Sequence, residues 1–211
     1  MTNGLRVLAG LLQLVASSAA IGLGGDFTLD RADGGRYALH ESHAEAVVLL
    51  FGYTSCPDVC PTGLSRIARA LRDLGDDASR VDALFVTLDP TRDTPARLRE
   101  YTRYFHPAII GLTGDTDRLD RVARLFNVRY AFVGKDTSEH YSMDHTANVY
   151  LVDPRGSVSA ILPYGLPSVA LTDALRAAIA AGRAAPAAGP GHPALDTTRD
   201  QGQPSDRSPV H

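Results

Sequence analysis

The sequence predicts one α/β domain built on a central β-sheet of mixed strand direction, with helices on its faces. Two patterns support this prediction. Short apolar strands alternate with segments whose apolar residues recur at helical spacing, which is typical of parallel strands joined by crossover helices. The last two strands instead flank the turn Asp153-Pro154-Arg155-Gly156, so we expect them to pair as an antiparallel hairpin before a final helix.

The composition supports a globular domain and excludes several other classes of protein. The chain has 211 residues, of which 44% are hydrophobic and 21% charged, enough for one domain with a sizeable core and some tails. The formal net charge of -3 does not indicate the positively charged surface that binds nucleic acid. The 2 cysteines are too few for a disulfide-rich scaffold or a four-thiolate zinc site. They can form one disulfide, one redox pair or two ligands of a mixed metal site.

Local signals place the individual elements. The turn Asp33-Gly34-Gly35 predicts an N-terminal β-hairpin. Residues 46–53 form a nearly continuous apolar run, which indicates a central strand buried on both faces. Thr94 and Pro95 are typical of an N-cap and a first helical residue. We further expect helices over residues 64–74, 116–126 and after a Ser168 cap, strands over 81–88, 108–112, 148–152 and 158–162, and a strand or extended loop over 128–133.

Both ends of the chain are expected to lie outside this domain. Residues 7–23 are apolar apart from Gln13 and small residues, and they follow Arg6, which is typical of a signal sequence or a short membrane anchor. We therefore assign residues 1–23 to such a segment and residues 24–181 to the domain, placed outside the cytoplasm. Residues 182–211 are rich in Ala, Pro and Gly and predict a disordered tail.

The two cysteines, Cys56 and Cys60, occupy the junction between the buried strand and the next helix. Functional groups gather at the carboxyl ends of strands in α/β sheets, and the amides and dipole of a helix N-terminus favour a thiolate. Four positions apart, the two thiols can close into a disulfide or bind one soft ion. A purely structural disulfide is the weaker interpretation, because so short a loop gains little stability from closure.

One of the seven histidines stands out as a third ligand. His145 directly precedes the expected strand 148–152, whereas His40, His43, His106 and His140 lie in loops and turns. If the fold is thioredoxin-like, this position normally holds a proline opposite the cysteines, so the imidazole would point at the thiols. Two thiolates and one imidazole suit copper better than structural zinc, which usually has four protein ligands.

Four motifs together resemble the Sco/SenC family of copper-binding thioredoxin-like proteins. They are the run 51–61 around Cys56-Pro57-Asp58-Val59-Cys60-Pro61, then Asp89-Pro90-Thr91-Arg92-Asp93-Thr94-Pro95, then Gly111-Leu112-Thr113-Gly114, and last Asp144-His145. The resemblance implies a thioredoxin-like fold over about residues 24–181. It also implies that Cys56, Cys60 and His145 ligate Cu(I) or Cu(II). Its implied role is assembly of the dinuclear copper centre in subunit II of cytochrome c oxidase, by copper delivery, by thiol reduction, or both.

Four acidic residues are expected near this site. Asp58 lies between the cysteines and can tune the metal, face a partner or stabilise the turn. Asp89 and Asp93 belong by resemblance to a motif beside the copper, so they are expected to support the ligands or dock a partner, although helix capping also explains them. Asp144 either orients His145 or ends the loop.

The sequence thus predicts a copper metallochaperone rather than an enzyme. The expected partners are subunit II or another copper protein, together with a thiol reductant, and membrane association would run through residues 7–23. The expected location is the bacterial periplasm or the outer face of the cytoplasmic membrane. Two alternatives use the same cysteine pair: a thiol–disulfide oxidoreductase, and a redox or copper sensor.

Overall fold

The computed structural model describes residues 22–134 and 141–184. They form a seven-stranded mixed sheet in the order β2-β1-β5-β4-β3-β8-β9, together with a separate two-stranded sheet of β6 and β7. Strands β3, β4 and β5 are parallel, and β8 and β1 run antiparallel to β3 and β5 at the two sides of this unit. The thioredoxin-like α/β prediction is confirmed.

The elements follow the expected order. The strands of the large sheet are β1 (Thr28–Arg31), β2 (Arg36–Ala38), β3 (Ala46–Gly52), β4 (Val81–Thr87), β5 (Ile109–Thr113), β8 (Val149–Val152) and β9 (Val158–Leu162). The helices are α1 (Val59–Leu74), α2 (Pro95–Phe105), α3 (Thr116–Leu125) and α4 (Ser168–Ala184), with short 3-10 turns at Leu39–Glu41 and Gly75–Arg80.

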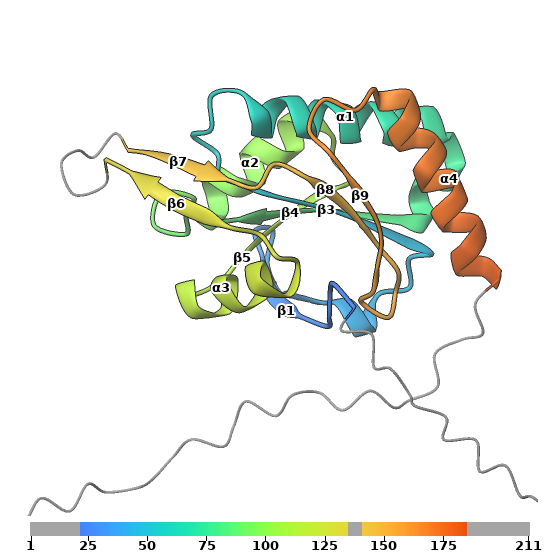
Figure 1. The fold of residues 1–211 in the computed structure, drawn as a ribbon, viewed down its shortest axis with the longest axis horizontal. Helices are drawn as coiled ribbons and strands as arrows, with labels where there is room; N and C mark the ends of the chain where they lie inside the picture. The colour runs from blue at the N-terminus through green and yellow to red at the C-terminus, as the bar shows by residue number, and fades with distance from the viewer. Residues whose placement is uncertain (1–21, 135–140, 185–211) are drawn as a thin grey trace, which may run out of the picture.

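The core lies on both faces of strand β3. All seven of its residues are buried, because β3 pairs with β4 on one side and β8 on the other. Helices α1, α2 and α4 cover one face of the sheet, and α3 covers the other (Figure 1). Side chains alternate accordingly: Phe51 packs against Phe126 and Tyr150, whereas Gly52 faces Cys60 of α1.

Several helix ends behave as the sequence signals indicate. The Thr94 side chain accepts the Arg97 N–H at the start of α2, and Asp115 accepts the Arg118 N–H at the start of α3. Gly75 ends α1 with a φ of 60°, a conformation that favours glycine. Helix α4 differs from expectation, since Ser168 is its first residue rather than its cap.

The sequence did not predict strand β7. It covers Ser142–His145 and pairs antiparallel with β6 (Tyr130–Val133), opposing Tyr130 to His145. The polar sequence of β7 has neither the apolar alternation nor the β-branched residues that mark a strand. This small sheet projects from the large one (Figure 1).

The expected terminal segments lie largely outside the described residues. Of the predicted signal or anchor segment, only residues 22 and 23 are described, and of the predicted tail only residues 182–184, which continue helix α4. His140 also lies outside the described part. Within residues 22–134 and 141–184, no helix combines the length and the apolar character that crossing a membrane requires.

Candidate metal centre

The cysteine loop is shaped by the transition from β3 to α1. Helix α1 begins at Val59, and its N-cap residue Asp58 makes no side-chain capping bond. The Cys56 Sγ instead accepts the main-chain N–H of Cys60 at 3.5 Å. The next residue, Pro61, has no N–H to satisfy. A sulfur atom therefore replaces the usual side-chain oxygen as the acceptor at this helix N-terminus.

Cys60 fits a narrow space beneath the loop. Its side chain is fully buried, and a Cβ atom added to Gly52 would lie 2.5 Å from its Sγ and 3.0 Å from the Phe85 ring. The last residue of β3 must therefore be a glycine for the thiol to sit against the strand. Cys56 is 9% exposed, so it is the outer member of the pair.

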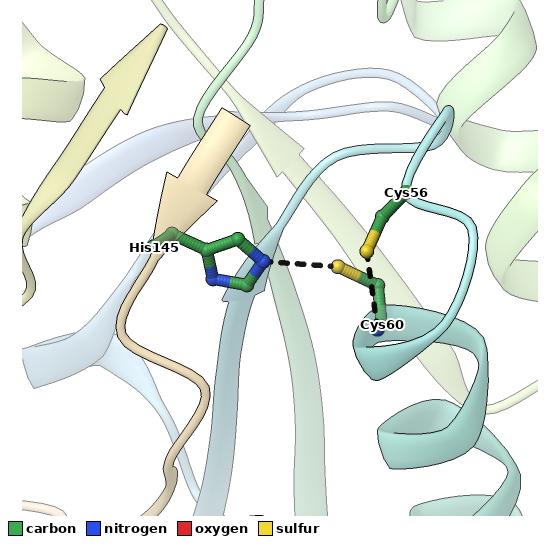
Figure 2. Close-up of side chains that lie close together, drawn as sticks. All are labelled: Cys56, Cys60 and His145. Atoms are coloured by element: carbon green, nitrogen blue, oxygen red, sulfur yellow. Dashed lines mark hydrogen bonds between the residues drawn. The ribbon is translucent and has the colours of Figure 1, made fainter. Parts of the chain in front are cut away.

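The third side chain comes from the other sheet. His145 ends β7, and its Nε2 lies 3.4 Å from the Cys60 Sγ, as Figure 2 shows. Its Nδ1 lies 3.0 Å from the carbonyl oxygen of Thr146. A carbonyl only accepts, so Nδ1 carries the proton and Nε2 turns its lone pair toward the thiols. The Tyr53 ring meets the imidazole edge to face, with centroids 5.9 Å apart.

The two thiols differ in acidity. The pKa of Cys56 is lowered to about 3, chiefly because the Cys60 side chain hydrogen-bonds to it, with main-chain N–H groups of the loop adding to the effect. The pKa of Cys60 is raised by the same hydrogen bond to Cys56 and by burial. At neutral pH the reduced pair therefore consists of an outer thiolate and an inner thiol.

These three residues have the spacing and chemistry of a metal-binding group. Their donor atoms all lie within 4.8 Å of one another. Metal–ligand bonds of roughly 2.0–2.3 Å place two ligands of one ion about 3.3–4.6 Å apart, so little movement is needed to bring all three onto one ion. Thiolate sulfur selects soft ions such as Cu(I), and imidazole suits copper as well as zinc. The expected proximity of His145 to the cysteines is confirmed.

Two of the four predicted acidic residues lie at the exposed rim. The Asp58 carboxylate accepts hydrogen bonds from the Thr62 hydroxyl at 3.5 Å and the Tyr164 hydroxyl at 3.2 Å. Asp144 is exposed on β7, and among the described residues no hydrogen bond joins it to His145. The Thr146 carbonyl orients the imidazole instead, which removes the orienting role considered for Asp144.

The other two acidic residues are buried behind the site. Asp93 accepts the main-chain N–H of Thr54 at 3.0 Å and the Thr54 hydroxyl at 2.5 Å, so it holds the residue two positions before Cys56. Burial raises the pKa of this carboxyl. Asp89 accepts from the Arg92 Nε and from the Tyr141 hydroxyl at 2.8 Å. Neither side chain reaches solvent to dock a partner directly, since both residues are at most 1% exposed.

Three residues make contacts around the site that were not predicted from the sequence. They are Tyr53, whose hydroxyl accepts the Met143 N–H at 3.3 Å, and Arg92 and Tyr141, which lie together over Asp89. Arg92 stands inside the motif 89–95 and Tyr53 inside the motif 51–61, so these motifs were the available signal for both. Tyr141 follows the polar segment 135–140 and had no such signal.

The fold and the site define a thioredoxin-like domain in which two cysteines of a strand-to-helix loop meet a histidine from a second sheet. A SCO1/SenC family profile matches residues 15–180 of the chain. The chain belongs to the SCO1/SenC family.

Individual relatives agree with this assignment. An SCO2-like protein of Rickettsia felis is 38% identical over 152 residues, which cover 72% of this chain and 73% of the relative. The structure of Bradyrhizobium japonicum ScoI with copper bound is similar with a TM-score of 0.68 and 35% identity, covering 74% of this chain and 98% of that one. Arabidopsis thaliana ScoI with copper bound gives a TM-score of 0.67 and 33% identity, covering 75% and 99%.

Proposed function

We propose that this protein is a copper metallochaperone that binds copper through Cys56, Cys60 and His145. The convergence of two sulfur atoms and one imidazole nitrogen within 4.8 Å is the observation that carries the proposal. Sco family proteins act in copper delivery to cytochrome c oxidase. We propose that the cargo of this chain goes to the dinuclear copper centre of subunit II, with a thiol reductant keeping the pair reduced.

The different exposure of the ligands supports transfer by ligand exchange. Cys56 is the outer thiolate and lies on a loop, where an incoming ligand from a partner can replace it first. Cys60 and His145 would keep the ion until the partner supplies further ligands. The exposed Asp58 and Asp144 flank this path, and we propose that they contact the partner.

The redox state of the cysteine pair would control copper binding. A disulfide removes both thiolate donors at once, leaving His145 alone. Because the chain has only 2 cysteines, any disulfide within one molecule is Cys56–Cys60. Copper occupancy and the disulfide therefore exclude each other.

We also propose that the domain works outside the cytoplasm. Residues 1–23 would be a signal sequence or an anchor, and residues 24–181 the copper-binding domain, whose last helix continues to Ala184. A periplasmic location, free or attached to the outer face of the membrane, would expose the domain to a partner's copper site. Fractionation of cells that produce the full chain tests this assignment.

Titration of the reduced protein with Cu(II) tests the copper site. We expect one-to-one binding with thiolate-to-copper charge-transfer absorption. Cys56→Ser and Cys60→Ser should each remove that absorption, and His145→Ala should weaken binding by roughly 10–100-fold. His43→Ala is the matched control, because His43 is exposed and remote in the chain from the cysteine loop. Unchanged binding in His145→Ala would remove this residue from the site.

A cellular test addresses the role in oxidase assembly. Deleting the gene should lower cytochrome c oxidase activity when copper is limiting, and added copper should restore part of it. Normal oxidase assembly at limiting copper in the deletion strain would contradict the chaperone assignment.

The unequal acidity of the cysteines favours one further function, thiol–disulfide reduction of the partner's copper site. The Cys56 thiolate would attack a partner disulfide, giving a mixed disulfide and a partner thiolate. Cys60, after losing its proton, would then attack the Cys56 sulfur and release the second partner thiolate. The partner gains two electrons and, on protonation, two protons, while this chain becomes the Cys56–Cys60 disulfide. If the reduced protein binds no copper but reduces an apo-subunit II disulfide, this function replaces the chaperone.

A further inference from the structure

The loop between β4 and α2, residues 88–94, contacts both halves of the candidate metal centre. At one end, Asp93 accepts hydrogen bonds from the amide and hydroxyl of Thr54, in the loop that carries Cys56. Asp89, near the other end of the loop, and Arg92 both contact Tyr141. Tyr141 directly precedes β7, the strand that carries His145. The same short segment thus touches the supports of the thiols and of the imidazole.

The two ends of this loop are fixed to each other by a buried threonine. The Thr87 hydroxyl donates to the Asp93 carboxylate at 2.6 Å and accepts the main-chain N–H of Asp89 at 3.0 Å. The Asp93 N–H also bonds to the carbonyl oxygen of Asp89 at 2.9 Å. All three residues are at most 1% exposed, so the hydrogen bonds that join the two ends of the loop are shielded from water.

Arg92 joins Asp89 to Tyr141, the residue directly before β7, through three contacts. Its Nε donates to Asp89, its Nη1 donates to the Tyr141 carbonyl oxygen at 2.7 Å, and its guanidinium carbon lies 3.5 Å from the centroid of the Tyr141 ring. The Tyr141 hydroxyl donates to the Asp89 carboxylate, so Asp89, Arg92 and Tyr141 each contact the other two. Only a planar guanidinium can donate to two acceptors while stacking on a ring, which a lysine ammonium cannot do.

Arg92 also lies near Tyr53, a residue of the cysteine loop whose ring contacts His145. Its guanidinium carbon lies 5.6 Å from the centroid of the Tyr53 ring, and that ring meets the His145 imidazole. The Arg92 Nη2 is buried and has no hydrogen-bond partner among the described residues. The two tyrosine rings therefore add to the charge compensation that the Asp89 carboxylate gives the guanidinium.

We propose that residues 88–94 act as a bracket that sets the distance between the thiols and the imidazole, and that Arg92 is the positioning residue for His145. This inference deepens the proposed function and rests on it for the identity of the ion. The bracket itself is a property of the protein without metal. Among the described strands β7 pairs with β6 and has no ladder with the seven-stranded sheet, so contacts such as those of Arg92 and Asp89 with Tyr141 help to fix its position relative to that sheet.

Hydrogen exchange of the reduced, metal-free protein tests the bracket independently of copper. In Arg92→Lys we expect amides of Ser142–His145 to exchange at least about tenfold faster, with the first turn of α1 unchanged. Arg99→Lys is the matched control, since Arg99 is exposed on α2 and its side chain makes no hydrogen bond or ion pair among the described residues. Exchange of β7 in Arg92→Lys at the rate of wild type and control overturns the proposal.

Copper titration of the same variants supplies the second measurement. Arg92→Lys should bind copper roughly 10–100-fold more weakly, with retained thiolate-to-copper absorption but altered spectral features that depend on His145. If Arg92→Lys fails to fold, Tyr141→Phe, which removes the hydroxyl that donates to Asp89 and keeps the ring, replaces it and should shift both measurements in the same direction. Unchanged affinity and spectrum in a folded variant refute the bracket. Absence of copper binding in the wild type refutes the proposed function, while faster exchange in the variants still supports the bracket.

Discussion

The two halves of the candidate metal centre are held by different means. The cysteines follow β3, whose residues are all buried and paired to strands on both sides, and Cys60 is fully buried in helix α1. His145 instead ends a strand of a two-stranded sheet in which Tyr130–Val133 is largely exposed. The sulfur half is part of the domain core, and the imidazole half is attached to that core through side chains.

This difference would let the candidate site hold an ion, as proposed, and still release it. A ligand set that is wholly fixed by the core would bind copper tightly but resist the rearrangement that transfer to a partner needs. A histidine on a separate small sheet can move relative to the thiols at a lower energetic cost, because no ladder of the large sheet breaks. We therefore expect changes in the core half to affect stability, and changes in the attachment to affect mainly the imidazole.

The largest effect should come from filling the space beside Cys60. Gly52→Ala adds a Cβ that would lie 2.5 Å from the Cys60 Sγ and 3.0 Å from Phe85. Overpacking of this kind costs about 1–3 kcal/mol, and here it would also displace a candidate ligand. Chemical denaturation and copper titration should show both losses. Gly114→Ala is the control, because its nearest contact is the flexible end of Leu29 at 3.3 Å. If the two variants are equally stable, Cys60 and Phe85 can move to make room for the added Cβ, and the sulfur half is not rigid.

A smaller effect is expected from weakening the attachment of β7. Tyr53→Phe keeps the ring against His145 but removes the acceptor for the Met143 N–H, at a cost of about 1 kcal/mol. We expect faster amide exchange in β7 and little change in thiolate-to-copper absorption. If that absorption is lost while amide exchange in β7 is unchanged, Tyr53 supports the thiols rather than the attachment of β7.

The smallest effect concerns the pH dependence of the bracket. Burial raises the folded-state pKa of Asp93 above the ordinary aspartate value near 3.9, with hydrogen bonds from Thr54 and Thr87 offsetting part of the rise. The folded protein therefore holds this proton more tightly than the unfolded chain. The resulting stability is present below about pH 3.9 and is lost as the pH rises through the folded pKa.

Asp93→Asn makes this contribution measurable. Both proteins share the titration of all other groups, so the difference in their free energies of unfolding isolates Asp93. We expect the wild type to lose stability relative to the variant as the pH rises through that window. A wild type that gains stability relative to Asp93→Asn over the same range would mean that the hydrogen bonds outweigh burial.

Much of this structure was predictable from the sequence. The apolar run 46–53, the helical spacing after Cys60, the cap at Thr94 and the turn at Asp153 each depend on neighbours a few positions away, and each was confirmed. The association of His145 with the cysteines was also predictable, because a family resemblance supplied the missing long-range information.

The sequence by itself determined the order of the helices and of the strands of the large sheet and the strand-to-helix position of Cys56 and Cys60, and the family resemblance added the three candidate donors. Only the tertiary structure decided that β7 exists, that Thr146 rather than Asp144 orients His145, and that Arg92 joins Asp89 to Tyr141. The physical reason is the separation in the sequence between the residues that interact. Helix caps, turns and strand or helix periodicity depend on interactions between residues close in the sequence. Arg92 and Tyr141 lie 49 positions apart and meet only when the loop and the small sheet pack together.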